Sequence, residues 1–142
     1  MEELSLSDLL QYAKEAGHNP CFLLHQGHEV NLIIQAVGEG WVSGFILGQG
    51  TRAVVLRHQA IAHMSGVEIP GPQLERRQRP QPGLMLLLTN LAALHPEVVV
   101  RGAEGISRGK LHQVGRDWFS LRLVTGNERL IPFVAMDWLE AL

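Results

Sequence analysis

Histidine is the residue type of this sequence that offers the clearest opening for chemistry. Seven histidines occur in 142 residues, and two of them, His25 and His28, are separated by only two positions. A structural zinc site needs three or four converging ligands, usually two close-spaced pairs that include cysteine. The chain has one cysteine, Cys21, and this single loose histidine pair. The sequence therefore predicts no metal site and no cofactor.

The acidic and hydroxyl residues do not form a catalytic pattern either. The candidate carboxylates are expected in turns or at strand ends, where solvated carboxylates are common: Glu104, Asp117, Glu128 and Asp137. No serine has the glycine-flanked setting of a nucleophile elbow, and residues 48–51 lack the lysine of a phosphate-binding loop. The sequence therefore predicts a protein that is not an enzyme.

Positive charge is concentrated in residues 75–79, Glu-Arg-Arg-Gln-Arg, within a stretch rich in proline and glycine. Arginines can follow a phosphate backbone, and an exposed tryptophan can stack on a base. The candidate contacts to nucleic acid or to a protein partner are Arg76, Arg77, Arg79, Arg116 and Trp118. The alternatives are a solvated linker for the arginines and a core or interface position for the tryptophan. A net charge of −2 and a pI near 6.4 argue against a grip on nucleic acid by the whole molecule.

Composition sets the class of protein that must position these residues. Hydrophobic residues make up 46% of the chain, which is ample for a packed interior. The longest apolar run, Leu84 to Leu88, is far shorter than a membrane span. The acidic start does not resemble a secretory signal, and a single cysteine is typical of a reducing compartment. We therefore expect a cytoplasmic protein that does not act at a membrane.

Two sets of short strands are predicted, one on each side of a linker. Residues 5–17 have the serine caps, apolar face and final glycine of a short amphipathic helix. Branched residues and glycine turns predict strands in residues 21–64 and again in residues 98–139. Between them, residues 84–94 have leucine or methionine on nearly every face, which predicts a mostly buried helix. The expected organisation is a helix and first repeat in residues 1–66, a linker in 67–83, and a helix and second repeat in 84–142.

The two strand regions contain an apparent internal repeat. Residues 39–57 align with residues 104–122 without a gap, and six of the nineteen aligned positions are identical. Glycines account for three of the six identities, which predicts equivalent turns and bends. The proposed structural glycines are Gly40, Gly44 and Gly50 in the first copy, and Gly105, Gly109 and Gly115 in the second. In this alignment the first copy lacks one hairpin, so it is expected to be a truncated repeat.

The second copy carries two phrases that resemble Sm-like proteins. One is Gly-x-Leu-x-x-Val-Gly-x-Asp-Trp, from Gly109 to Trp118, and the other is Leu-Ile-Pro-x-x-Ala, from Leu130 to Ala135. The chain is most similar to tandem Sm-like proteins of actinobacteria, some of which are labelled Fis family regulators. The resemblance implies a mainly β fold of two Sm-like, SH3-like small antiparallel barrels, with a short N-terminal helix and a connecting helix. No helix-turn-helix pattern supports the regulator label.

The departures from the Sm pattern bear on function. In RNA-binding Sm proteins an Asp and an Asn after the strand-two glycine help to hold a uridine base. Gly115 and Phe119 stand at these positions in the second copy, and Gly50 and Val54 in the first. Because recognition of a base needs polar partners, the uridine site is expected to be absent. The predicted function is a non-enzymatic binding or scaffold module that associates with itself, as a homodimer or larger assembly, or with another protein; an RNA-binding Sm-like regulator is the alternative.

Overall fold

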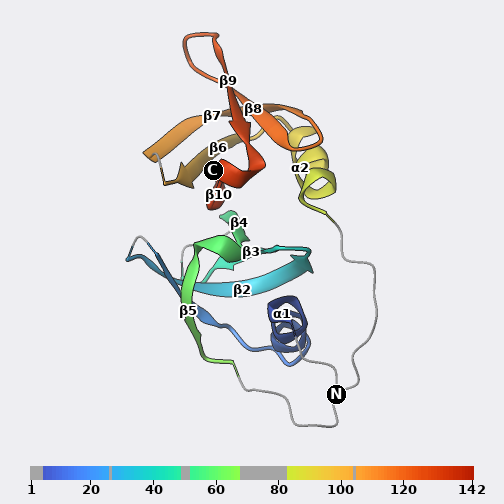
Figure 1. Cartoon of the computed structure of the whole chain (residues 1–142), viewed down its shortest axis with the longest axis vertical. Coiled ribbons are helices and arrows are strands. Elements are labelled where there is room, and N and C mark those ends of the chain that lie inside the picture. Colours follow the sequence, from blue (N-terminus) through green and yellow to red (C-terminus); the bar gives the residue numbers. More distant parts are fainter. Residues whose placement is uncertain (1–4, 26, 49–51, 68–82, 104) are drawn as a thin grey trace.

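The computed structural model describes residues 5–25, 27–48, 52–67, 83–103 and 105–142. Within these ranges the chain forms ten strands and two α-helices, and every paired strand is antiparallel to its neighbours (Figure 1). The elements are, in chain order, α1 (Leu6–Glu15), β1 (Cys21–Leu24), β2 (Glu29–Gly38), β3 (Trp41–Ile46), β4 (Ala53–Arg57), the 3-10 helix η1 (His58–Ala60), β5 (Ile61–Ser65), α2 (Leu84–Ala92), β6 (Glu97–Gly102), β7 (Gly105–Val114), β8 (Trp118–Arg122), β9 (Glu128–Pro132), the 3-10 helix η2 (Phe133–Ala135) and β10 (Trp138–Ala141). The prediction of a mainly β protein is confirmed.

The two halves of the chain use the same strand order within one sheet. The order is β5-β1-β2-β3-β4 in the first half, α1 to β5, and β10-β6-β7-β8-β9 in the second half, α2 to β10. Pairing of β4 with β10 joins the halves into a single sheet of ten strands. No pairing among the described strands closes this sheet, so β5 and β9 form its two ends. The first half has five strands, as the second has, and is therefore not truncated.

The predicted alignment of the glycine-framed segments is wrong in its register. Residues 39–57 contain β3 and β4, whereas residues 105–122 contain β7 and β8, and β7 holds the place in the strand order that β2 holds in the first half. The strand pairings align β3 with β8 instead. Trp41 faces Arg57 across β3 and β4, as Trp118 faces Pro132 across β8 and β9.

The glycines explain how the wrong register arose. Gly38 and Gly115 are the true equivalents, because a side chain at either position would collide with the indole of Trp41 or Trp118. Gly44 and Gly109 lie inside strands, where a Cβ would strike the carbonyl oxygen of Ile33 or Arg122. Gly40 lies in the β2–β3 turn and Gly105 begins β7, both with positive φ, and Gly50 lies outside the described residues. The sequence alignment therefore matched glycines that are required for different structural reasons.

Each half carries one helix on its sheet. Ser5 caps α1: its side-chain oxygen accepts the backbone N–H of Asp8 at 3.1 Å, and the Asp8 carboxylate accepts the N–H of Ser5 at 2.9 Å. Leu10 and Ala13 of this helix are buried against the strands of the first half, where α1 lies along β2 (Figure 1). In the second half, α2 packs on β7. The predicted N-terminal and connecting helices are both present.

The connecting helix is less buried than its sequence predicts. Leu84, Leu88 and Ala92 are buried, but Leu86 is 56% exposed, and Leu87 and Leu91 are only half-buried. The helix packs on β7 of its own half, and Leu87 and Leu91 line a pocket shared with the first half, whereas Met85 and Leu86 are exposed to solvent. The expectation that Leu86 is covered in the junction between the halves is therefore wrong for the isolated chain.

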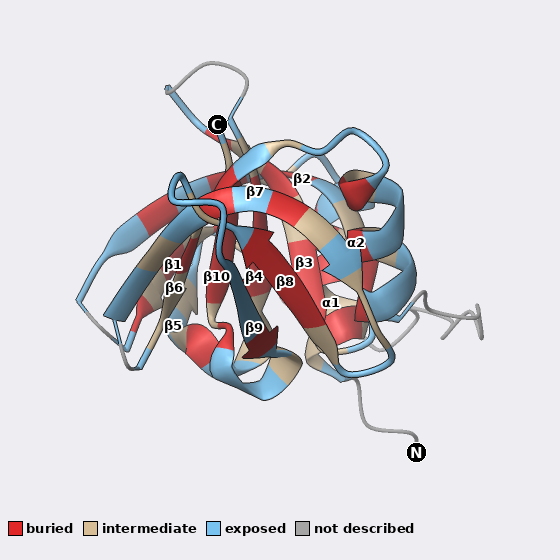
Figure 2. Cartoon of the chain, turned by 90° about the horizontal axis from the view of Figure 1, so that it is seen from above, coloured by how far each residue is buried: buried red, intermediate tan, exposed pale blue. Residues whose placement is uncertain are grey.

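The hydrophobic residues form two cores that exchange side chains between the halves. Trp138, which belongs to β10, is part of the core of the first half. Trp41 and Val55, which belong to β3 and β4, are part of the core of the second half. Figure 2 shows buried residues on β3, β4, β10 and β8, strands that belong to both halves. The halves are packed as one unit by side chains that each contributes to the other.

No helix in the described part of the chain is long and apolar enough to cross a membrane.

Candidate interaction surface

The junction between the halves shows which contacts complete a strand edge in this protein. Strands β4 and β10 pair over four residues, from Ala53 with Ala141 to Leu56 with Trp138. Beyond the backbone, Val55 is only 5% exposed and Trp41 only 1%, because the second half covers both. Two kinds of contact therefore complete the edge of β4. The backbone pairs with β10, and apolar residues of the second half bury the side chains of Val55 and Trp41.

Three polar side chains of the first half form hydrogen bonds or an ion pair with the second half at this junction. Arg52 Nη1 lies 3.1 Å from Oε1 of Glu140, which is buried. Arg57 Nη1 donates to the carbonyl oxygen of Phe133 at 2.8 Å, and Gln59 Nε2 donates to Asp137 Oδ1 at 2.9 Å. Burial at the junction removes water from the Glu140 carboxylate, which costs free energy. The ion pair with Arg52 offsets this desolvation cost.

In the second half, β9 pairs with β8 on one side, and no described strand pairs with its outer edge. Leu130 corresponds to Val55, because both face the equivalent serines of the preceding strand, Ser120 and Ser43. Leu130 is 64% exposed, whereas Val55 is buried. Trp118, the equivalent of Trp41, is partly exposed. The two positions that the second half covers on β3 and β4 are therefore uncovered on β8 and β9.

At the open edge of β9, apolar residues stand at two of the three positions that make polar contacts at the edge of β4. The residues that correspond to Arg57 and Gln59 are Pro132 and Val134, both exposed. Val134 is 78% exposed. A proline in a strand is typical of a sheet edge, because it has no N–H to donate to a further strand. We define the β9 edge surface as the apolar group Trp118, Leu130, Pro132 and Val134.

Sequence reasoning found only part of this surface. Trp118 was a candidate contact residue, with a core or interface position as its alternative, and Arg116 lies beside it, exposed in the turn between β7 and β8. Leu130 and Val134 were missed as contact residues, although the adjacent apolar pair Leu130-Ile131 in a short strand indicates that one of the two must point outward. Arg76, Arg77 and Arg79 lie outside the described residues, so they are not placed relative to Trp118.

The residues that the resemblance aligns with the uridine-binding positions of Sm proteins have no polar side chain. Phe119 is fully buried in the core of the second half, and Val54 is buried in that of the first. Gly115 lies under the indole ring of Trp118, and Gly50 is outside the described residues. In the register given by the strand pairings, Gly38 and Val42, and not Gly50 and Val54, correspond to Gly115 and Phe119. None of these six residues carries a polar side-chain atom that could bind a base edge.

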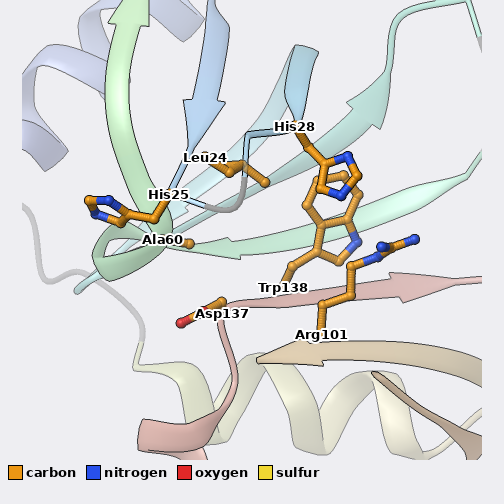
Figure 3. A pocket seen from close by; sticks show the side chains of 7 residues that line it. All are labelled: Leu24, His25, His28, Ala60, Arg101, Asp137 and Trp138. Atoms are coloured by element: carbon orange, nitrogen blue, oxygen red, sulfur yellow. The ribbon is translucent and has the colours of Figure 1, made fainter. Parts of the chain in front are cut away.

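A small pocket with polar residues lies on the other side of the junction (Figure 3). Its enclosed space is about 10 Å³, which is about enough for one water molecule. The guanidinium carbon of Arg101 lies 5.9 Å from the ring centroid of Trp138, close enough for a cation–π contact. Figure 3 shows His28 on the same side, whereas His25 and Asp137 point to the other side of the pocket. The protein's own side chains fill this space, which leaves no room for an organic substrate.

A second polar cluster tethers the start of the edge strand β9. Glu128 Oε1 pairs with Nδ1 of His112 and with Nη2 of Arg122, the latter at 3.2 Å. His95 has a positive backbone φ of 46°. The centroid of its ring lies 6.1 Å from the centroid of the His112 ring. Among the described residues, no three histidine, cysteine or acidic side chains are grouped so that they could hold a metal ion. The cluster links the start of β9 to β7 through His112 and to β8 through Arg122.

Two titratable groups at the junction are shifted by burial. Desolvation lowers the pKa of His58, against a backbone hydrogen bond at Trp41 that raises it. Desolvation likewise lowers the pKa of the Arg57 guanidinium, and the charge of Asp137 opposes that shift. Both groups lie where the halves meet, and neither of them lines the pocket of Figure 3.

Comparison with protein-family models, with curated proteins and with solved structures finds no significant match to this chain.

Proposed function

We propose that this protein is a non-enzymatic scaffold module of two Sm-like barrels that assembles head-to-tail through the open edges of its sheet. The Sm-like assignment is supported by the organisation of each half: one helix precedes five antiparallel strands in the same order, and a 3-10 turn precedes the fifth strand. The sequence phrases that resemble Sm-like proteins fall on β7, β8 and β9.

The observation that carries the assembly proposal is the contrast between Val55 and Leu130. In the chain itself, the fourth strand of one half pairs with the fifth strand of the other, and this contact buries Val55 and Trp41. Strands β9 and β5 are the corresponding fourth and fifth strands, and each has an open edge. A second copy that pairs its β5 with β9 would cover Leu130 and Trp118 in the same way. Exposed apolar strand edges are sites of association because their N–H and C=O groups lack partners.

The contact between copies should be weaker than the contact within the chain. It lacks the equivalents of Arg57 and Gln59, since Pro132 and Val134 stand at these positions, and Asn127 stands where Arg52 pairs with Glu140. The interface would join two different surfaces, so each copy keeps one open edge after it binds. Assembly therefore continues until a ring closes or a filament grows.

The first experiment blocks each edge with a charge. Lysine on an edge strand prevents pairing because it cannot be buried without a partner. Leu130→Lys blocks β9, Ala62→Lys blocks β5 at an exposed position, and Val124→Lys is the control at a fully exposed position in the β8–β9 hairpin. Sedimentation velocity over a concentration series should show assembly of the parent and of the control. Each edge variant should weaken association at least about tenfold: Leu130→Lys loses the burial of one leucine, and Ala62→Lys would bring a charge into the contact.

The second experiment tests whether the contact is head-to-tail. Leu130→Lys keeps an open β5 and Ala62→Lys keeps an open β9, so a mixture of the two can form one junction. An equimolar mixture should give heterodimers and no larger species, while each variant alone stays monomeric. A parent chain that is monomeric at high concentration, or edge variants that assemble as the parent does, would refute self-association.

Nucleic-acid binding is the rival function, and Arg116 beside the partly exposed Trp118 is the observation in its favour. Uridine-rich and mixed oligonucleotides should be titrated into the parent chain over a salt series. A contact with phosphates weakens steeply as salt increases. Tight binding that Trp118→Ala and Arg116→Ala abolish would favour the RNA reading, whereas absence of binding from low salt upward would leave the scaffold proposal in place.

A further inference from the structure

A second pocket lies on the α2 side of the junction and is large enough for a small molecule. Its cavity is about 130 Å³, between helix α2 and strands β3, β4 and β10. Both halves build it: the residues that define its shape are Ala53 and Val55 from the first half, and Leu87, Leu91, Leu139 and Ala141 from the second. It is therefore continuous with the contact between β4 and β10.

The cavity exists because small residues lie beneath the helix. Ala53 and Ala141 are paired across the β4–β10 junction, so two short side chains meet at one place. Gly44 beside them has no space for a side chain, since a Cβ there would collide with the carbonyl oxygen of Ile33. Above this floor, Leu87 and Leu91 are only half-buried. A molecule in the cavity would finish burying them.

The lining determines the chemistry of the ligand. None of the residues that line the pocket is charged, and only Gln35 and Ser43 bring polar side chains to it. A charged ligand would lose its hydration without gaining a partner. In size, a dry cavity of about 150 Å³ lined by aliphatic side chains holds benzene. The pocket therefore matches one ring or a short branched alkyl group.

We propose that this junction pocket binds a small neutral molecule with an apolar body of one-ring size and a single hydrogen-bonding end that faces Gln35 or Ser43. The site is independent of the open edges, so it does not rest on self-association. Because its walls come from both halves, the ligand binds the folded junction and not the separated halves. Bound ligand must then raise the thermal stability of the chain.

The probe for this site is p-cresol, with 4-hydroxybenzoate as its charged counterpart of similar size. Saturation-transfer NMR and thermal unfolding should show saturable binding and a rise in Tm with p-cresol and neither effect with 4-hydroxybenzoate. Ala53→Leu fills the cavity and should abolish both effects. Ala16→Leu makes the same change at an exposed position at the end of α1, and should bind as the parent does.

A variant that enlarges the pocket keeps the test decisive if Ala53→Leu does not fold. Leu91→Ala widens the cavity, so it should bind 2-naphthol at least about tenfold more tightly than the parent, in line with burial of the additional ring. Binding of p-cresol that Ala53→Leu leaves unchanged would overturn the proposal, as would a parent chain with no saturable binding. Equal binding of the neutral and the charged probe would overturn it as well.

Discussion

At the scale of single residues, His58 links the junction to pH. Its Nε2 is buried without a hydrogen-bond partner, and burial lowers its pKa below the ordinary value of 6.5. The unfolded chain therefore takes up a proton near pH 6.5, and the folded chain does so only at lower pH. Between these two values the unfolded state binds more protons, so stability falls as the pH is lowered through this window and is complete above 6.5.

A substitution with a precedent in the chain tests this effect. Phe133 occupies the place of His58 in the second half: His58 N–H donates to the Gly40 carbonyl oxygen, as Phe133 N–H donates to that of Asp117. His58→Phe should flatten the acid-side loss of stability, measured by urea unfolding at several pH values between 7.5 and 5. The other six histidines are unchanged. An equal pH slope in parent and variant would show that His58 is not the group responsible.

Phe119, which the resemblance aligns with the uridine-binding Asn of Sm proteins, tests the assignment of this residue to the core. Its side chain is fully buried, and its ring centroid lies 6.2 Å from that of Phe133. Phe119→Ala should lower the free energy of unfolding by about 3–5 kcal/mol, because it removes transfer energy and leaves a cavity. Urea unfolding measures the loss, and Val124→Ala at a fully exposed position is the control. A loss below about 1 kcal/mol would contradict the core assignment.

At the scale of elements, α2 has one apolar face that packs and another that does not. Leu88 is fully buried on β7, whereas Leu86 is 56% exposed. Leu88→Ala should therefore cost about 2–5 kcal/mol of stability, and Leu86→Ala should stay within about 0.5 kcal/mol. The two variants make the same chemical change two positions apart, so helix propensity cancels in their comparison. Similar losses in chemical denaturation would mean that a partner chain covers Leu86.

The sequence predicted the elements better than their relationships. The strand-rich regions, α1 and the helix at Leu84 follow from local patterns of apolar residues, turns and caps, which act within a few residues. The equivalence of β3 and β8 was missed because glycine serves turns and close backbone contacts alike, so shared glycines do not fix a register. The pairing of β4 with β10 was not predicted, since a strand's own residues do not specify which distant edge completes it.

The same limit applies to the β9 edge surface. Val55 and Leu130 are both aliphatic residues in short strands, and nothing local distinguishes the buried one from the exposed one. Only the position of each strand in the sheet does so, because β4 is central and β9 is terminal. Pro132 and the adjacent apolar pair Leu130-Ile131 were the local signs of an edge. Candidate contacts chosen by charge, such as Arg76 and Arg77, carried no such information about the sheet.

At the scale of the whole molecule, the exchange of side chains between the cores makes the halves depend on each other. Trp138 fills the first core, and Trp41 fills the second. A buried aromatic side chain of this size contributes roughly 4–6 kcal/mol through the apolar area it removes from water. That is comparable to the total stability of a small domain. Neither half should keep its fold when the tryptophan from the other is absent.

Fragments comprising residues 1–66 and 84–142 test this dependence. Each fragment alone should unfold without a cooperative transition, because β4 and β10 no longer pair. Its tryptophan fluorescence should resemble that of an unfolded chain. An equimolar mixture should regain a cooperative transition if the β4–β10 pairing and the exchanged side chains suffice to rejoin the halves. The intact chain should unfold in one transition, with equal calorimetric and van't Hoff enthalpies. Cooperative melting of the 84–142 fragment by itself would show that the second half is an independent domain, and that Trp41 and Val55 only cover a core already complete without them.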